Sequence, residues 1–299
     1  MGIKPFLRSC FGLSPRSARR VTVKVAIRPE TSGTLAMFRW ELACSHCVDS
    51  YSRMGTETLL ERAERVLRDE VAPKAEAMDG DPDALAEGLA VLAREGLLAL
   101  KRPKEFGGPE LSDPDIRRFQ EIVARVSGAL AFLQTQHQGV SGMLAGSPNR
   151  ALAEEYLPHM HDGTCLVGVG FSQLRRPGPP IVRGERTEGG YLINGNVPWV
   201  TGFGFYQEFV VGAALPDGQA VFGLVPLREE ATVHPTPPMR LAAMSAAGTV
   251  AVQLDDFFLP DERVIAVREA GWISNSDAIN IAQQGTFALG CAQAGLDVL

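Results

Sequence analysis

Trp199 and Thr201 are the residues of this sequence whose types and spacing first suggest a binding chemistry. They stand two apart in a strand-like run, and side chains two apart on a β-strand point to the same face. An indole supplies a flat aromatic surface and a threonine hydroxyl supplies a hydrogen-bond donor, so the pair could contact one flat heteroaromatic ligand. Taken alone, the two residues favour a plainer alternative, a core tryptophan beside a β-forming threonine.

Other reactive side chains form no complete motif. Cys44 and Cys47 are spaced as a C-x-x-C, but they have no second ligand pair for zinc and no strand-to-helix context for redox chemistry. His159 and His161 lie two apart without a carboxylate or cysteine cluster, and residues 202–204 are an incomplete G-x-G-x-x-G. We therefore predict no metal site and no dinucleotide loop.

The composition excludes several classes of partner. The chain has 299 residues, 45% of them apolar, and a formal net charge of -6. Residues 1–53 hold nine basic and three acidic residues, which leaves 20 basic and 32 acidic residues beyond them, a net charge of -12. Such an acidic body repels nucleic-acid phosphates. Because no apolar run approaches the roughly 18 residues that span a bilayer, we predict neither a nucleic-acid partner nor a membrane span.

Cysteine usage and the first residues bear on localisation. The five cysteines are odd in number and irregularly spaced, which favours a reducing compartment and a cytoplasmic protein. Residues 1–53 read as an extension, with scattered arginines and no acidic residue before Glu30. They are interpreted either as an organellar transit peptide or as upstream sequence translated from a misplaced start. The second interpretation is favoured, since Met54 would open a domain naturally.

Helical patterns dominate residues 54–162, which we assign to an N-terminal helical domain. Thr58 and Glu61 fit a capping box that begins the first helix, and Pro73 marks its end. The starts and ends of three further helices are indicated by Asp83 and Gly96, by Ser112-Asp113-Pro114, and by the apolar run 129–144.

His137 stands in a polar break of the fourth predicted helix. We expect a buried, hydrogen-bonded histidine there in preference to one that faces an active site.

The periodicity changes from helical to strand-like after Gly163. Strand-like runs separated by turns rich in proline and glycine cover residues 165–171, 190–200, 208–214, 220–226 and 249–258. Residues 163–268 are therefore assigned to a middle, β-barrel-like domain. Helical spacing returns after Ser276 and continues to Leu299, so residues 269–299 read as the start of a truncated C-terminal helical bundle. The predicted fold class is α+β.

This order of domains and four sequence segments resemble the acyl-CoA dehydrogenase family. The segments are residues 95–108, 151–163, 190–201 and 252–265. The last two are the most specific, because one contains Gly190-Tyr191-Leu192-Ile193-Asn194-Gly195 followed by Trp199-Val200-Thr201 and the other ends its strand in Phe257-Phe258-Leu259-Pro260. Together the resemblance covers about residues 56–299.

The resemblance implies FAD as the cofactor and an acyl thioester or another small apolar substrate. It also implies a homo-oligomer for the full-length protein. It assigns cofactor binding to Phe171, Ser172, Trp199 and Thr201. In this setting Trp199 and Thr201 are interpreted as contacts of the flat flavin ring.

The segment 172–178 departs from the family pattern. The family has a Thr-Glu-Pro segment and a Gly-Ser turn at this place, whereas here only Ser172 retains a hydroxyl. Arg175 and Arg176 could bind phosphates or a carboxylate of the substrate, but solvated surface is the favoured interpretation.

No catalytic base can be assigned. Family members remove a substrate proton with a glutamate in the late C-terminal helices, which lie beyond Leu299 here, or near the start of the first of them. At the early position this chain has Asn280, which is no base at neutral pH. Asp277 is out of register and is interpreted as a helix N-cap.

Three functions are therefore in competition. The leading hypothesis is an FAD-dependent oxidoreductase that acts on the CH–CH group of an acyl-CoA-like thioester. The first alternative is a flavin-dependent monooxygenase of the same fold, which needs no carboxylate base. The second is a non-catalytic, truncated paralogue.

Overall fold

The computed structural model describes residues 21–23, 40–42 and 57–299, except for the side chains of residues 279–284. The chain divides into two compact units, Met1–Thr58 and Leu59–Leu299. In the first unit, β1 (Val21–Val23) and β2 (Trp40–Leu42) pair in antiparallel fashion. The C-x-x-C of Cys44 and Cys47 lies outside the described residues.

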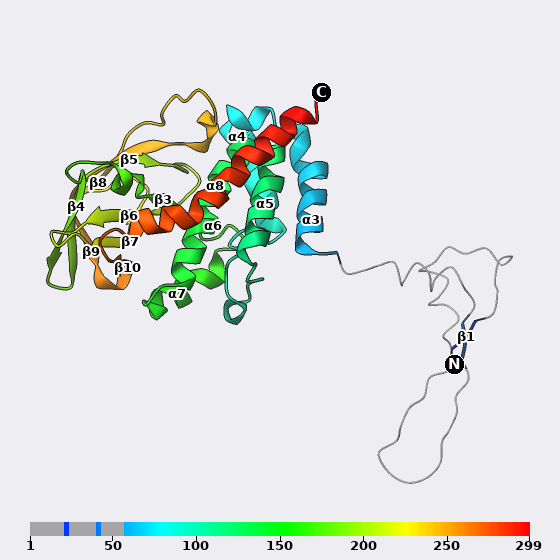
Figure 1. The fold of residues 1–299 in the computed structure, drawn as a ribbon, viewed down its shortest axis with the longest axis horizontal. Coiled ribbons are helices and arrows are strands. Elements are labelled where there is room, and N and C mark those ends of the chain that lie inside the picture. The colour runs from blue at the N-terminus through cyan, green and yellow to red at the C-terminus, as the bar shows by residue number, and fades with distance from the viewer. Residues whose placement is uncertain (1–20, 24–39, 43–56) are drawn as a thin grey trace, which may run out of the picture. The chain divides into compact units, whose positions relative to one another are not determined.

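Helices form the first part of the second unit (Figure 1). They are α3 (Leu59–Val66), α4 (Pro82–Arg94), α5 (Asp113–Val126), α6 (Gly128–Ala145) and α7 (Arg150–Tyr156). A polar side chain caps the N-terminus of each of the last four by accepting a backbone N–H bond, and the capping residues are Asp81, Ser112, Ser127 and Asn149. These caps satisfy backbone donors that a helix cannot satisfy internally.

Proline and glycine lie at or near the ends of the first two helices, α3 and α4. After α3 the chain continues as a π-helical turn over Leu67–Val71 and a 3₁₀ turn over Ala72–Lys74, which contains Pro73. The regular α-helix therefore ends earlier than Pro73 predicts, while the burial of its apolar face continues through Leu67 and Val71. Gly96 follows α4 at a φ of +65°, the left-handed conformation that glycine adopts without strain.

A mixed eight-stranded sheet follows the helices. Its strands are β3 (Val167–Gly170), β4 (Val182–Thr187), β5 (Gly190–Val200), β6 (Glu208–Ala214), β7 (Ala220–Pro226), β8 (Val233–Pro235), β9 (Val250–Pro260) and β10 (Val264–Arg268). The strand order is β10-β7-β6-β4-β5-β9-β8, and β3 pairs in parallel with β6. The α+β fold class is confirmed, and the bounds of β5, β6 and β7 agree with the predicted runs.

The helix α8 (Trp272–Leu296) connects the sheet to the helical part. It begins beside the sheet, where the Trp272 ring packs at 5.2 Å from Phe222 of β7, and then runs along α5 (Figure 1). Gly290 allows this close approach, because a Cβ there would lie 2.4 Å from the backbone oxygen of Glu121. Among residues 57–299, no helix is long and apolar enough to cross a membrane.

The start of α8 corrects one sequence interpretation. The helix begins at Trp272 with Gly271 as its N-cap residue, more than a turn before Asp277. Asp277 is therefore not the N-cap. The domain boundaries at residues 54, 163 and 269 stay predictions, since the compact unit Leu59–Leu299 contains the helices and the sheet together.

Candidate functional site

The predicted cofactor residues lie where β3 and β5 end beside each other. A Cβ added at Gly170, the last residue of β3, would lie 2.9 Å from Val200 of β5 and 2.7 Å from the Phe209 ring. Only a glycine lets the two strands come this close. Phe171 and Ser172 follow β3 directly, while Trp199 and Thr201 flank the end of β5, so the fold brings both predicted segments into one region.

Trp199 and Thr201 have different surroundings. The Trp199 residue is 44% exposed, a large fraction for an indole, whereas Thr201 is only 5% exposed. The pairing register between β5 and β9 shifts between Val197 and Val200, immediately before Thr201. The Thr201 hydroxyl lies 3.1 Å from that of Thr249. The region thus combines an exposed aromatic side chain with a buried pair of hydroxyls.

The short helix η6 (Ser172–Arg175) completes this region. It lies against β5, β6 and α8. The Gln173 amide nitrogen donates to the backbone oxygens of Gly170, at 3.2 Å, and Gly212, at 2.8 Å, which fastens the turn to the sheet. The Ser172 hydroxyl oxygen is buried and has no hydrogen-bond partner among the described residues. An orphaned buried hydroxyl calls for an explanation, and a bound ligand would satisfy it.

Phe171 takes a different position from the other three candidates. Its ring is partly buried and packs edge-on against Phe222, with centroids 5.5 Å apart, against the apolar cluster that contains Phe222. Its side chain therefore contributes to the core, and it is the backbone of Phe171 that leads into η6.

Arg175 and Asp277 form an ion pair that sequence reasoning missed. The Arg175 Nε and Nη2 atoms each lie 2.7 Å from a different Asp277 carboxylate oxygen, and the guanidinium carbon lies 5.8 Å from the centre of the Phe171 ring. Arg175 is exposed, as the surface interpretation expects, but its guanidinium is held by Asp277. No local spacing could have signalled this contact, because 102 residues separate the partners.

The ion pair determines the chemistry of Asp277. Hydrogen bonding from Arg175 lowers the pKa of the Asp277 carboxyl below its usual value. A carboxylate stabilised in this way is a weak proton acceptor. The side chain of Asn280, at the family's early base position, lies outside the described residues.

His137 is buried and hydrogen-bonded, as predicted. Its Nε2 lies 2.7 Å from the Met160 carbonyl oxygen, and its Nδ1 accepts from the backbone N–H of Val167 at 3.1 Å. Burial lowers the pKa of His137 to about 4. His137 is thus a structural tie between α6 and the start of β3.

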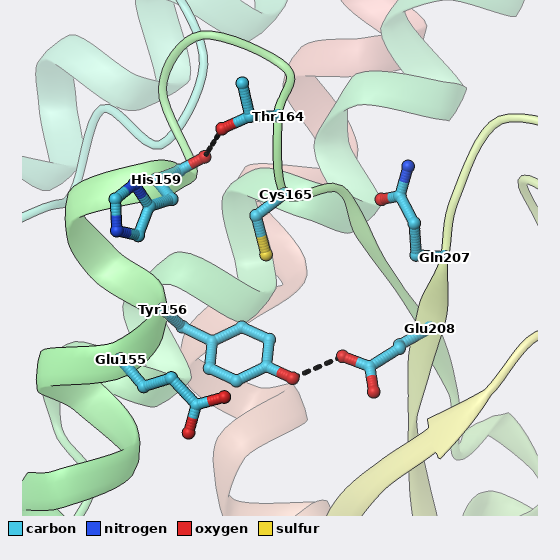
Figure 2. Close-up of a pocket in the computed structure, with 7 residues that line it drawn as sticks. All are labelled: Glu155, Tyr156, His159, Thr164, Cys165, Gln207 and Glu208. Carbon is cyan, nitrogen blue, oxygen red and sulfur yellow. Dashed lines mark hydrogen bonds between the residues drawn. The ribbon is translucent and has the colours of Figure 1, made fainter.

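One pocket of about 330 Å³ lies at the opposite end of β3 from Ser172. It is lined by Glu155, Tyr156, His159, Thr164, Cys165, Gln207 and Glu208 (Figure 2). The Glu208 carboxylate of this pocket accepts hydrogen bonds from the Tyr156 hydroxyl and from Arg263. It is therefore already paired within the protein. Burial raises the pKa of the Cys165 thiol to about 11, which makes it a poor nucleophile.

The described residues contain no group of three or more histidine, cysteine, aspartate or glutamate side chains able to hold a metal ion.

Comparisons with known proteins agree with this architecture. Residues 55–164 match the family described as acyl-CoA dehydrogenase, N-terminal domain. The very long-chain specific acyl-CoA dehydrogenase of mouse mitochondria is 27% identical over 242 residues, which cover 74% of this chain and 35% of that enzyme. The helical part of the chain thus matches the acyl-CoA dehydrogenase N-terminal domain, and the chain as a whole is similar to acyl-CoA dehydrogenases.

Two other proteins are similar to this chain. The oxygenase component of p-hydroxyphenylacetate 3-hydroxylase from Acinetobacter baumannii is 23% identical over 222 residues, covering 71% of this chain and 48% of that protein. A solved acyl-CoA dehydrogenase from Bacillus anthracis, complexed with FAD, shares the fold with a TM-score of 0.67 and 22% identity, over 80% of this chain and 43% of that chain. The chain spans about a third of the length of the first curated relatives it matches.

Proposed function

We propose that this chain is the flavin-binding part of a flavin-dependent oxidoreductase. The observation that carries the proposal is the exposed indole of Trp199 at the end of β5, in the same region as the orphaned Ser172 hydroxyl. A flat ring system needs an aromatic or apolar surface beside it and donors at its heteroatoms, and these residues fit that need. Trp199, Thr201 and Ser172 would hold the flavin, and we propose FAD as its form.

The first candidate reaction is oxidation of the CH–CH group of an acyl-CoA-like thioester. The match of residues 55–164 to the acyl-CoA dehydrogenase N-terminal domain and the similarity to an acyl-CoA dehydrogenase support it. The bound flavin would supply the hydride acceptor. The protein would have to hold the thioester beside Trp199 and present a base to its α-carbon. Asp277 does not suit that role because its carboxylate is engaged by Arg175.

The second candidate is a flavin-dependent monooxygenase. One observation favours it: the only acidic side chain of the first two turns of α8, Asp277, is in an ion pair, and oxygen chemistry needs no carboxylate base there. A hydroxylase component among the relatives adds support. In this reaction the chain's residues would bind the flavin and exclude water from it. The non-catalytic alternative predicts no flavin binding at all.

The test is a flavin assay on the purified chain. Absorbance and extraction would give the amount and identity of bound flavin after incubation with FAD or FMN. Anaerobic loss of the oxidised flavin absorbance on adding acyl-CoA would support the dehydrogenase. Consumption of oxygen by the reduced flavin without acyl-CoA turnover would support the monooxygenase. Failure to bind either flavin would refute both.

Two further properties are proposed with the function. We propose a cytoplasmic location, with an organellar one as the alternative if residues 1–53 act as a transit peptide. We also propose that the full-length protein is a homo-oligomer, which sedimentation analysis would test.

A further inference from the structure

The turn that carries Ser172 is fastened from two sides. On the sheet side, Gln173 donates to the backbone of β3 at Gly170 and of β6 at Gly212. On the helix side, Arg175 pairs with Asp277 of α8 through two parallel hydrogen bonds of 2.7 Å. Such paired contacts fix direction as well as distance, because the guanidinium and the carboxylate must lie nearly in one plane.

The two attachments differ in exposure. Gln173 is 5% exposed, whereas the side chains of Arg175 and Asp277 are 37% and 33% exposed. Arg175 also lies over the Phe171 ring, so one side chain orients the residue before Ser172 and reaches the helix beyond it. The contact of Gln173 with the sheet is thus buried, whereas the contact of Arg175 with α8 is partly exposed.

We propose that Arg175 is a positioning residue, whose ion pair with Asp277 holds the Ser172 hydroxyl in the place where it meets the flavin. The inference rests on the proposed flavin site. In this inference the guanidinium of Arg175 binds the Asp277 carboxylate and does not bind the phosphates of a substrate. In the family pattern this segment carries other residues, so the pair gives this chain its own means of ordering the segment.

The test uses the full chain and three variants. Arg175→Met and Asp277→Asn remove the pair, and Arg175→Lys keeps the charge but loses the paired geometry. Arg186→Met is the matched control, because Arg186 makes a similar paired contact with Asp261, between the Val182–Thr187 strand and the turn after β9. Flavin binding is followed by fluorescence titration with FAD and FMN, and the amide hydrogen exchange of residues 172–176 is measured in parallel.

The removal variants are expected to bind flavin about fivefold more weakly, since a partly exposed ion pair contributes on the order of a factor of five. Their flavin absorption bands shift, and exchange at 172–176 becomes faster. Arg175→Lys shows a smaller loss, and Arg186→Met shows none. A merely structural role would not change the flavin spectrum.

Several results would overturn the inference. One is that both removal variants bind flavin with the affinity and the absorption spectrum of wild type. Another is that Arg186→Met loses as much flavin affinity as they do. If Arg175→Met fails to fold, Arg175→Lys and Asp277→Asn decide the question. Failure of the proposed function gives a different pattern, in which the wild-type chain itself binds no flavin.

Discussion

At the scale of single residues, Trp199 is expected to matter for flavin binding and little for the stability of the fold. Trp199 belongs to neither apolar core cluster, and its 44% exposure leaves a large part of its aromatic surface open to a ligand. We expect Trp199→Ala to weaken flavin binding by about tenfold or more, in the range measured for aromatic stacking. The free energy of unfolding should change by less than about 1 kcal/mol.

Fluorescence titration and chemical denaturation would check both parts of this prediction. Phe258→Ala is the control, because Phe258 is similarly exposed, at 46%, and pairs with Leu192 near the other end of β5. Equal flavin affinity in wild type and Trp199→Ala would remove this residue from the site.

At the scale of elements, patterning predicted the long strands rich in apolar residues and missed two strands that lack an apolar run. The strands β5, β6 and β7 are apolar runs bounded by glycine, proline or aspartate turns, and their bounds agree with the prediction. The strand β4 has the sequence VRGERT, whose charged residues hide its strand character, and it is ordered by pairing along its whole length with β5. The strand β8 is only three residues long.

The candidate site was only partly predictable for a related reason. Trp199 and Thr201 stand in one run, so their proximity follows from local spacing. The contact of Arg175 with Asp277 and the contact of Thr201 with Thr249 depend on how distant elements pack. No periodicity encodes such contacts.

The close approach of β3 to β5 gives a prediction at this scale. Gly170→Ala would place a Cβ within 2.9 Å of Val200 and of the Phe209 ring, so a strand must shift. We expect a loss of about 1–3 kcal/mol in the free energy of unfolding, as for overpacked cores. Gly139→Ala is the matched control, because nothing lies within 4 Å of its added Cβ in α6.

In an exposed helix interior, alanine in place of glycine stabilises by about 0.5–1 kcal/mol. The two variants should therefore shift urea midpoints in opposite directions. A Gly170→Ala protein as stable as wild type would mean that β3 does not lie this close to β5.

At the scale of the whole molecule, His137 joins the helical part to the sheet. Its Nδ1 accepts from the Val167 N–H, so the ring proton is on Nε2 and is donated to the Met160 carbonyl. Only the neutral imidazole can make both bonds. Protonation at Nδ1 would set two donors against each other, and burial already lowers the pKa of His137 to about 4.

The sign of the pH dependence follows from this lowered pKa. Above about pH 6.5 the imidazole is neutral in both the folded and the unfolded chain, so stability does not depend on it. Between pH 6.5 and 4 the unfolded chain binds a proton that the folded chain excludes, and the free energy of unfolding falls by up to about 3 kcal/mol. Asp113 and Asp277 are examples of aspartates whose pKa is lowered from the usual value of 3.8. Their protonation therefore reduces the free energy of unfolding only at lower pH than this window.

Urea denaturation at pH 7.5 and 5.0 would measure this fall in wild type, His137→Gln and His159→Gln. The His137→Gln variant should be less stable than wild type at pH 7.5. Because glutamine does not titrate, the stability of this variant should decline less between pH 7.5 and 5.0. His159 is exposed, and its replacement should leave the wild-type decline unchanged. Because His137 bonds both to the loop after α7 and to β3, a decline that persists in His137→Gln would show that acid weakens this junction through other groups.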